Sequence, residues 1–374
     1  MSKEPIGIAI TPITSDSVKL EVDLIFQWCE RLQIAQYVEL YSINQNLTQL
    51  PNAIRLTQSA FNLLTPGFNT IDLTLKLEEL NDSNHLTREI LLALFASPIS
   101  LDFLSYQQLK SAVRVRENIV RAAKMTALDF NTSDAAERPE EYWTYSEVTG
   151  FILRQGKNLI EALISATQPN VSGQLYSFSC YRATEYIILL AIAQEAREFN
   201  PLLYSQLEKQ WQKKAIMSGR FHDVFLCEYG TVEDPLPIQY YVPGDRIWFK
   251  NPDDNSSDIE GYEGSWVFYL GQGKFPDFWK LNHLFSVQSK CIEIYHWRHG
   301  AYRNDQGELL MDEDKVERYV SASLSHTQDV KDITERMFKL RDPQGIYADG
   351  GCMDRTREVP RNVIHGFNQV VWDI

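Results

Sequence analysis

The chain has 374 residues, of which 44% are hydrophobic, 23% charged and 12% aromatic, a composition typical of a globular protein that can form its own core. Its 50 acidic and 36 basic residues give a formal net charge of −14. This argues against a general surface for nucleic acid or anionic membranes, because such surfaces need clustered Lys and Arg. The longest apolar stretch, residues 186–193, is too short to cross a bilayer.

The cysteines indicate a reducing compartment. Their number is odd and no pair has CxxC spacing, so neither a disulfide framework nor a structural zinc site is expected. The first residues also lack the charged start, long apolar run and small-residue cleavage site of a signal peptide. We therefore expect a cytoplasmic protein with reduced thiols at five positions: Cys29, Cys180, Cys227, Cys291 and Cys352.

The first part of the chain shows two helical patterns. Residues 15–34 carry apolar side chains at helical spacing after Asp and Ser residues that can cap the start. A second helix is expected over residues 87–96, which follow Asn84 and end before Pro98. Residues 1–95 are therefore interpreted as a helical N-terminal extension.

The pattern is clearer from Ser105 onward. Ser105 can cap a helix over residues 106–128, which has an apolar face and a basic face. An extended aromatic segment and a short helix are expected next, before the most hydrophobic helix of the chain, which starts close to Cys180. The predicted ranges of these three elements are 142–153, 157–166 and 179–199.

The second half is rich in strand patterns. Residues 238–250 form two aromatic extended runs separated by the turn sequence Pro243-Gly244-Asp245. Strands are also expected over residues 265–270 and 291–297, with the glycines around Gln272 as a turn. Helices followed by strands predict an α+β fold. The expected division is an extension (1–95), a catalytic domain (96–312) and a C-terminal extension (313–374).

Cys180 is the first candidate for chemistry. A thiol at the N-terminus of a buried helix lies where the helix dipole and free N–H groups stabilise a thiolate. The same N–H groups can hold an oxyanion during acyl transfer. The alternative interpretation is structural, because free cysteines are often buried and inert.

A cysteine nucleophile needs a histidine within hydrogen-bond reach. Spacing alone does not choose among His222, His283, His296 and His299. Cys291 with His296 and His299 resembles a set of metal ligands, but neighbouring strand residues point to opposite faces, so no metal is expected there. The acidic residues 253–263 are interpreted as a solvated loop, because the regular ligand spacing of calcium loops is absent.

Three segments around these residues resemble the bacterial spore-coat protein-glutamine transglutaminases (gamma-glutamyltransferases). Residues 176–180 and the apolar helix after them are similar to the catalytic segment of that family, and residues 243–252 to its Gly-Asp and Phe-Lys-Asn-Pro block. Residues 262–271 are similar to its Trp-x-Gly-Glu block. The helix after Ser105, Tyr142-Trp143 and Gly173 also fit, so the resemblance covers residues 100–300 in order. The matching sequences are YSFSC, PGDRIWFKNP and YEGSWVFYLG.

The resemblance implies a papain-like domain of the NlpC/P60 type that needs no metal or cofactor. In this family a cysteine, Cys180 here, forms a thioester with a glutamine carboxamide, and a primary amine then resolves it into an isopeptide bond. The implied partners are a glutamine-containing protein, or another acyl donor, and a primary amine. No nucleic acid or membrane is implied.

The family pattern is incomplete in this chain. Ser179 and Ser265 stand where the family has Glu, and Phe278 stands where it has the catalytic His. His283 is the nearest replacement for the base, and Glu263 is the candidate to orient it. The alternatives are a degenerate binding or assembly module that keeps the fold, and an amidase in which water resolves the thioester.

Overall fold

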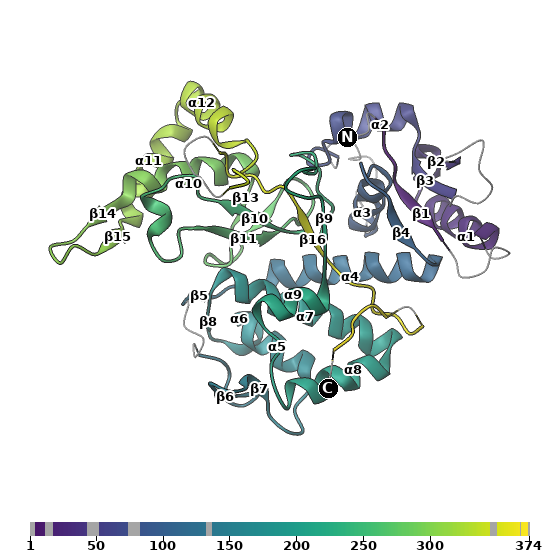
Figure 1. The fold of residues 1–374 in the computed structure, drawn as a ribbon, viewed down its shortest axis with the longest axis horizontal. Helices are drawn as coiled ribbons and strands as arrows, with labels where there is room; N and C mark the ends of the chain where they lie inside the picture. The colour runs from purple at the N-terminus through teal and green to yellow at the C-terminus, as the bar shows by residue number, and fades with distance from the viewer. Residues whose placement is uncertain are drawn as a thin grey trace.

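The computed structural model describes residues 4–11, 18–42, 52–73, 83–131, 137–344, 350–366 and 368–372. These residues form three regions, each with a hydrophobic core, around the long helix α4 (Tyr106–Met125) (Figure 1). The first half of α4 belongs to the core of the N-terminal region through Leu109 and Val113. Its second half belongs to the central helical core through Ile119 and Val120. One helix therefore joins two cores.

The N-terminal region is a mixed sheet with helices, which corrects the expectation of a helical extension. Its strand order is β2-β3-β1-β4, with β1 parallel to β4 and antiparallel to β3. The strands are short apolar runs that the helical patterns on either side obscured. The start of the predicted first helix, residues 15–17, lies outside the described residues. The elements are β1 (Ile8–Ile10), α1 (Val18–Arg31), η2 (Ala35–Tyr37), β2 (Val38–Ser42), β3 (Asn52–Leu56), α2 (Gln58–Leu64), η3 (Pro66–Phe68), α3 (His85–Phe95) and β4 (Leu101–Phe103).

The central region is helical and surrounds α7 (Cys180–Phe199), as predicted. Every residue of α7 from Ala183 to Ala193 is buried, so this helix is the centre of the core. α7 packs against α4, α5, α8 and β11, and the region also contains the two-stranded pairs β5–β8 and β6–β7. The remaining elements are β5 (Asp129–Phe130), β6 (Trp143–Ser146), β7 (Gly150–Leu153), α5 (Leu159–Thr167), α6 (Pro169–Ser172), β8 (Ser177–Phe178), α8 (Pro201–Trp211) and α9 (Ser218–Phe225).

The third region is built on an antiparallel sheet with the order β11-β10-β16-β9. One face of this sheet contributes Phe268 to the core around α7, and the other contributes Ile247 and Phe249 to a core with α10, α11 and α12. The elements are β9 (Leu226–Tyr229), β10 (Arg246–Lys250), η6 (Ser256–Asp258), β11 (Gly264–Phe268), β12 (Phe275–Pro276), β13 (Leu284–Phe285), α10 (Val287–Gly300), β14 (Ala301–Arg303), β15 (Leu309–Met311), α11 (Glu313–Leu324), α12 (Thr327–Met337) and β16 (Arg357–Pro360).

The strand expected over residues 291–297 is helix α10, so that prediction is wrong. A capping box between Ser286 and Ser289 starts the helix, and buried residues occur all around it. Alternation over a short run does not separate a strand from a helix buried on several sides.

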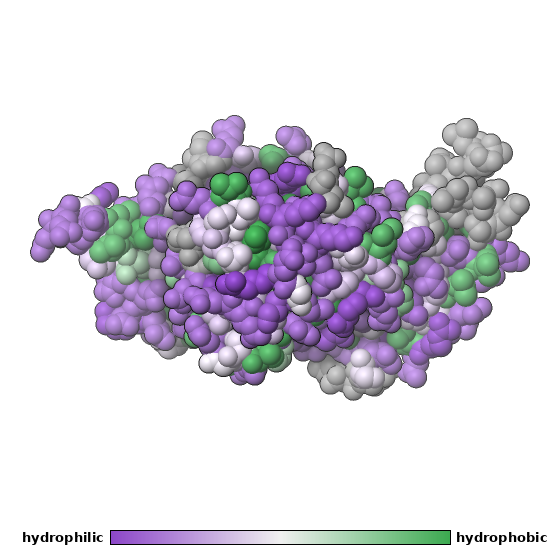
Figure 2. Space-filling view, turned by 90° about the horizontal axis from the view of Figure 1, so that it is seen from below, coloured by the Kyte–Doolittle hydropathy of each residue, from purple (hydrophilic) through white to green (hydrophobic). Residues whose placement is uncertain are grey.

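The C-terminal residues return to the centre of the molecule. β16 lies between β9 and β10, so residues 357–360 complete the sheet next to α7 (Figure 1). The α+β class is confirmed by these helices and antiparallel strands. None of the helices in the described ranges is long and apolar enough to span a membrane. The face in Figure 2 is mainly hydrophilic, with apolar residues in small separate groups.

Candidate active site

Cys180 is the first residue of α7, and the short strand β8 leads into it. Ser179 is the N-cap, and its hydroxyl accepts a hydrogen bond of 3.2 Å from the backbone N–H of Arg182. A serine is well suited to this position because its short side chain reaches the free N–H groups of the first turn. Ser179, which stands where the acid of the spore-coat enzymes is expected, therefore has a capping role here.

The thiol of Cys180 is half-buried, and its surroundings favour the protonated form. Burial raises the pKa of Cys180 above the ordinary thiol value. The backbone N–H groups of Trp266 and Tyr181 and the charge of Arg246 lower it, and the charge of Glu263 raises it again. The expected thiolate stabilisation at the helix start is present, but burial outweighs it. Cys180 is therefore mainly a neutral thiol at neutral pH.

An aromatic group of the sheet faces the start of α7. The ring of Trp266 lies 5.6 Å from the ring of Tyr181, edge to face, and stacks on Trp248 at 5.8 Å. Trp248 and Trp266 are directly opposite each other in the β10–β11 register, so the pair is fixed by the sheet. The nucleophile candidate thus lies between a helix N-terminus and a rigid aromatic surface.

His283 lies in the loop that joins β12 to β13, and its partner is Asp277 rather than Glu263. The distance from His283 Nδ1 to Asp277 Oδ2 is 2.9 Å, and the His283 side chain is 55% exposed. Glu263 instead accepts a hydrogen bond from the backbone N–H of Gly261, while its charge acts on Cys180. Asp277 is thus the carboxylate that contacts His283 here, and the orienting role of Glu263 stays a prediction.

The loop of His283 is fixed next to the strands that lead into Cys180. The backbone N–H of Leu128 donates to the carbonyl oxygen of Phe278 (2.8 Å), and the ring of Trp279 contacts Phe130 at 5.4 Å. Phe130 belongs to β5, which pairs with β8 immediately before Cys180. No histidine in the described chain forms a hydrogen bond with the Cys180 sulfur.

The comparisons with known proteins identify the family. A family model described as "TGL: Protein-glutamine gamma-glutamyltransferase" matches residues 69–287, which is more than half of the chain. The chain belongs to this family. It is similar to a protein-glutamine gamma-glutamyltransferase of Halalkalibacterium halodurans, with 25% identity over 202 residues that cover 53% of this chain and 66% of the relative.

A solved structure, a transglutaminase from Geobacillus stearothermophilus without its C-terminal extension, matches with 17% identity and a TM-score of 0.38. The match covers 57% of this chain and 97% of that one. The family resemblance read from the sequence is therefore confirmed by the family match, whereas the papain-like arrangement stays a prediction.

Phe278 shows how this member departs from the family pattern. It occupies the register of the expected histidine and is 2% exposed, packed in the core that surrounds α7. Ser265, in the register of the second acid, faces Phe249 in the β10–β11 pair. Neither position supplies an ionisable group beside Cys180.

Among the other sequence candidates, His222 on α9 lies 3.3 Å from Glu358, while the rest lie on α10 and the C-terminal segment. His296 Nδ1 lies 2.9 Å from His299 Nδ1, and its Nε2 lies 2.8 Å from the Ser323 hydroxyl. The Cys291 and Cys352 sulfurs are 3.2 Å apart and fully buried. Among the described residues, no group of three or more His, Cys, Asp and Glu side chains could hold a metal ion.

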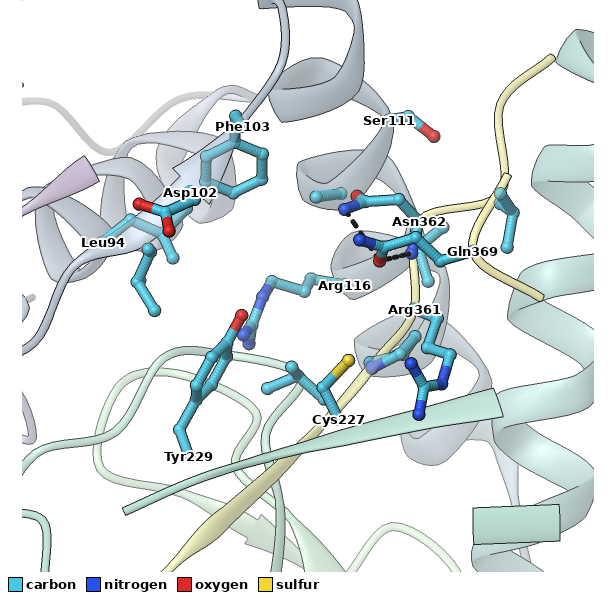
Figure 3. Close-up of a pocket in the computed structure, with 16 residues that line it drawn as sticks. Leu94, Asp102, Phe103, Ser111, Arg116, Cys227, Tyr229, Arg361, Asn362 and Gln369 are labelled. Carbon is cyan, nitrogen blue, oxygen red and sulfur yellow. Dashed lines mark hydrogen bonds between the residues drawn. The ribbon is translucent and has the colours of Figure 1, made fainter. Parts of the chain in front are cut away.

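A small cavity of about 40 Å³ lies between α4, β4, β9 and the C-terminal segment (Figure 3). Arg116, Cys227, Tyr229 and Arg361 border it in the close-up, and Cys180 is not among its lining residues. Burial raises the pKa of Cys227, and the charge of Arg361 lowers it. This volume has room for about two or three water molecules.

Two residues of the site were missed by the sequence interpretation. Arg246 lies inside the Gly-Asp block, where its charge carried no signal of a role. Glu358 is 112 residues farther along the chain, yet faces Arg246 directly across the β10–β16 pair. Only the sheet topology brings these two together.

Proposed function

We propose that the chain is a protein-glutamine gamma-glutamyltransferase that works through a thioester on Cys180. The Cys180 sulfur attacks the carboxamide carbon of a glutamine side chain and ammonia leaves. A primary amine such as a lysine side chain then attacks the thioester, forms the isopeptide bond and releases the thiol. The proposal places the enzyme in the cytoplasm, where the thiol stays reduced.

The observation that carries the proposal is the position of Cys180. Its sulfur lies at the N-terminus of a buried helix, and the N–H groups of Tyr181 and Trp266 act on it. Such N–H groups stabilise negative charge on sulfur and on the oxygen of a tetrahedral intermediate. Family membership adds the reaction class.

His283 is the proposed base. Asp277 holds its Nδ1 nitrogen, which leaves Nε2 for proton transfer, as in other carboxylate–histidine pairs. The loop that carries it is anchored through Phe278 and Trp279 to the strand next to β8. Tightening of this loop on a bound substrate would bring the imidazole toward the sulfur, because catalytic hydrogen bonds often form only in the substrate complex.

The experiment is the transfer of a fluorescent primary amine to a glutamine peptide by the wild type and by Cys180→Ala. The matched control is Cys227→Ala, since Cys227 is also a half-buried free thiol but lies outside the site. We expect transfer by the wild type and by the control variant, and none by Cys180→Ala. Transfer that survives Cys180→Ala would refute the proposal.

A second function is favoured by the departures from the family pattern. Phe278 is buried in the histidine register, and burial keeps the pKa of Cys180 high. A binding or assembly module that keeps the fold would use residues 1–95 and 313–374 for partner contacts. No transfer by the wild type, together with His283→Gln and Cys180→Ala variants that keep the same thermal stability as the wild type, would support this function.

A further inference from the structure

Arg246 is a buried cation directly behind Cys180. It is the first residue of β10, 1% exposed, and faces Phe268 on β11 and Glu358 on β16. Its guanidinium carbon lies 4.3 Å from the ring centroid of Tyr181 and 4.3 Å from that of Trp266. These are the two residues whose backbone N–H groups act on the Cys180 sulfur. The cation is thus held in the wall of the active site.

The guanidinium has hydrogen-bonding capacity that the fold does not use. Nη1 donates to Glu358 Oε2 at 2.9 Å, but Nε and Nη2 are buried without an acceptor among the described residues. Aromatic faces attract a cation but do not replace a hydrogen-bond acceptor. Buried donors without an acceptor are unusual in folded proteins. An anion that forms at Cys180 would therefore meet a cation whose hydrogen-bonding capacity Glu358 uses only in part.

Glu358 partly neutralises the positive charge of Arg246 and so weakens its electrostatic effect on Cys180. Its second oxygen, Oε1, lies 3.3 Å from His222 Nε2, so the carboxylate bridges Arg246 and the imidazole. Several other charged groups lie around this bridge. Those that interact with Cys180, Arg246 or Glu358 are Glu185 on α7, His222 on α9, Glu228 on β9, Glu263 before β11, and Asp354 before β16, and Glu185 is itself paired with Arg182 on α7.

We propose that Arg246 is the electrostatic partner of the Cys180 thiolate, and that Glu358 attenuates its charge. A guanidinium does not give up its proton in proteins, so Arg246 stabilises the thiolate without acting as a base. In the family pattern a histidine beside the cysteine would supply this positive charge as an imidazolium. In this chain Phe278 stands at that position, and Arg246 supplies part of the charge instead. As an account of catalysis, the inference rests on the proposed function, whereas the thiol test below does not.

The test is the pH dependence of iodoacetamide alkylation at Cys180, read by peptide mass spectrometry. Arg246→Met removes the cation at similar length, and Glu358→Gln removes its counter-charge at the same size. We expect the apparent pKa of Cys180 to rise in the first variant and to fall in the second. Each shift should be at least about half a pKa unit, which is a change of about threefold in the thiolate fraction.

The control is Arg114→Met. Arg114 forms a 2.5 Å ion pair with Glu195, and Glu195 lies on α7 fifteen residues after Cys180, ~22 Å along the axis. This variant loses a cation paired to the same helix and should leave the alkylation profile of Cys180 unchanged. Glu263→Gln is an independent test of the direction of the electrostatic effect. It should lower the pKa of Cys180, since the charge of Glu263 raises that pKa.

A purely structural role for Arg246 would give shifts of the same sign in Arg246→Met and Glu358→Gln, or none, and either result overturns the inference. If Arg246→Met does not fold, Glu358→Gln and Glu263→Gln decide alone, and no fall of the pKa in Glu358→Gln overturns it. Opposite shifts without amine transfer by the wild type would support the electrostatic pairing and refute the catalytic proposal.

Discussion

Asp245→Asn tests how much the buried ion pair between Arg116 and Asp245, the residue before Arg246, stabilises the fold around the site. Arg116 of α4 donates to Asp245 Oδ1 at 2.7 Å and also to the carbonyl oxygens of Val242 and Pro243. The side chains are 7% and 2% exposed. This contact fixes the turn from which β10 starts, and therefore the place of Arg246 behind Cys180.

The cost of the change follows from burial. At 2.7 Å and an effective dielectric constant of about 20, the gross attraction is about 6 kcal/mol, and desolvation offsets much of it. Removing one charge leaves Arg116 buried without its counter-charge, which costs about 3 to 5 kcal/mol. The introduced amide keeps part of the hydrogen bonding, so we expect the free energy of unfolding to fall by about 3 kcal/mol, the lower end of this range.

The matched control is Glu141→Gln. Lys157 and Glu141 are also 2.7 Å apart, but their side chains are 34% and 67% exposed. Exposed pairs contribute about 0.2–1 kcal/mol, so this variant should lose less than 1 kcal/mol. Urea unfolding followed by circular dichroism compares the two variants with the wild type. Equal costs, or a cost below about 1 kcal/mol for Asp245→Asn, would refute the argument from burial.

Three further predictions concern the thiol, a glycine and a histidine. Because burial raises the pKa of Cys180, its alkylation at pH 7 should be slower than that of a free thiol. The alkylation rate should increase only above pH ~8.5, and a fast reaction at pH 6 would contradict this prediction. Gly264→Ala should destabilise the β10–β11 pair by more than about 2 kcal/mol in the same urea assay, because the new Cβ would lie 2.2 Å from Trp248 Nε1. Gly219→Ala, in a helix with open space around it, should not destabilise the fold. Burial and a neighbouring histidine lower the pKa of His296 from 6.5 to about 4, so the unfolded chain binds the proton more tightly. Stability is then lost as the pH falls from 6.5 toward 4, and His296→Gln should flatten this dependence of the urea midpoint.

The helices that position Cys180 could be predicted from local sequence. Ser105 is the N-cap that the sequence predicted, whereas Ser179, included in the predicted helix 179–199, is the N-cap of α7; the helices begin at Tyr106 and Cys180. These elements have capping residues and long apolar periodicity, which local physics is sufficient to specify.

What local sequence could not give is the pairing of distant strands. Nothing near Glu358 indicates that β16 enters the sheet beside β10, or that its carboxylate meets Arg246. The strand prediction at Cys291 was wrong for a related reason. The segment is a helix buried on several sides by the core of the third region, and a short local pattern does not show this burial. The partner of His283 was also missed, because Asp277 reaches it through the β12–β13 hairpin.

The most direct test of the central claim is the intact mass of the chain after incubation with a glutamine peptide in the absence of an amine. The account predicts an adduct on the wild type equal to the peptide less one ammonia, located at Cys180 and discharged when a primary amine is added. The Cys180→Ala variant should stay unmodified. An unmodified wild type from pH 7 to pH 10, where the thiolate becomes available, would contradict acyl transfer through Cys180.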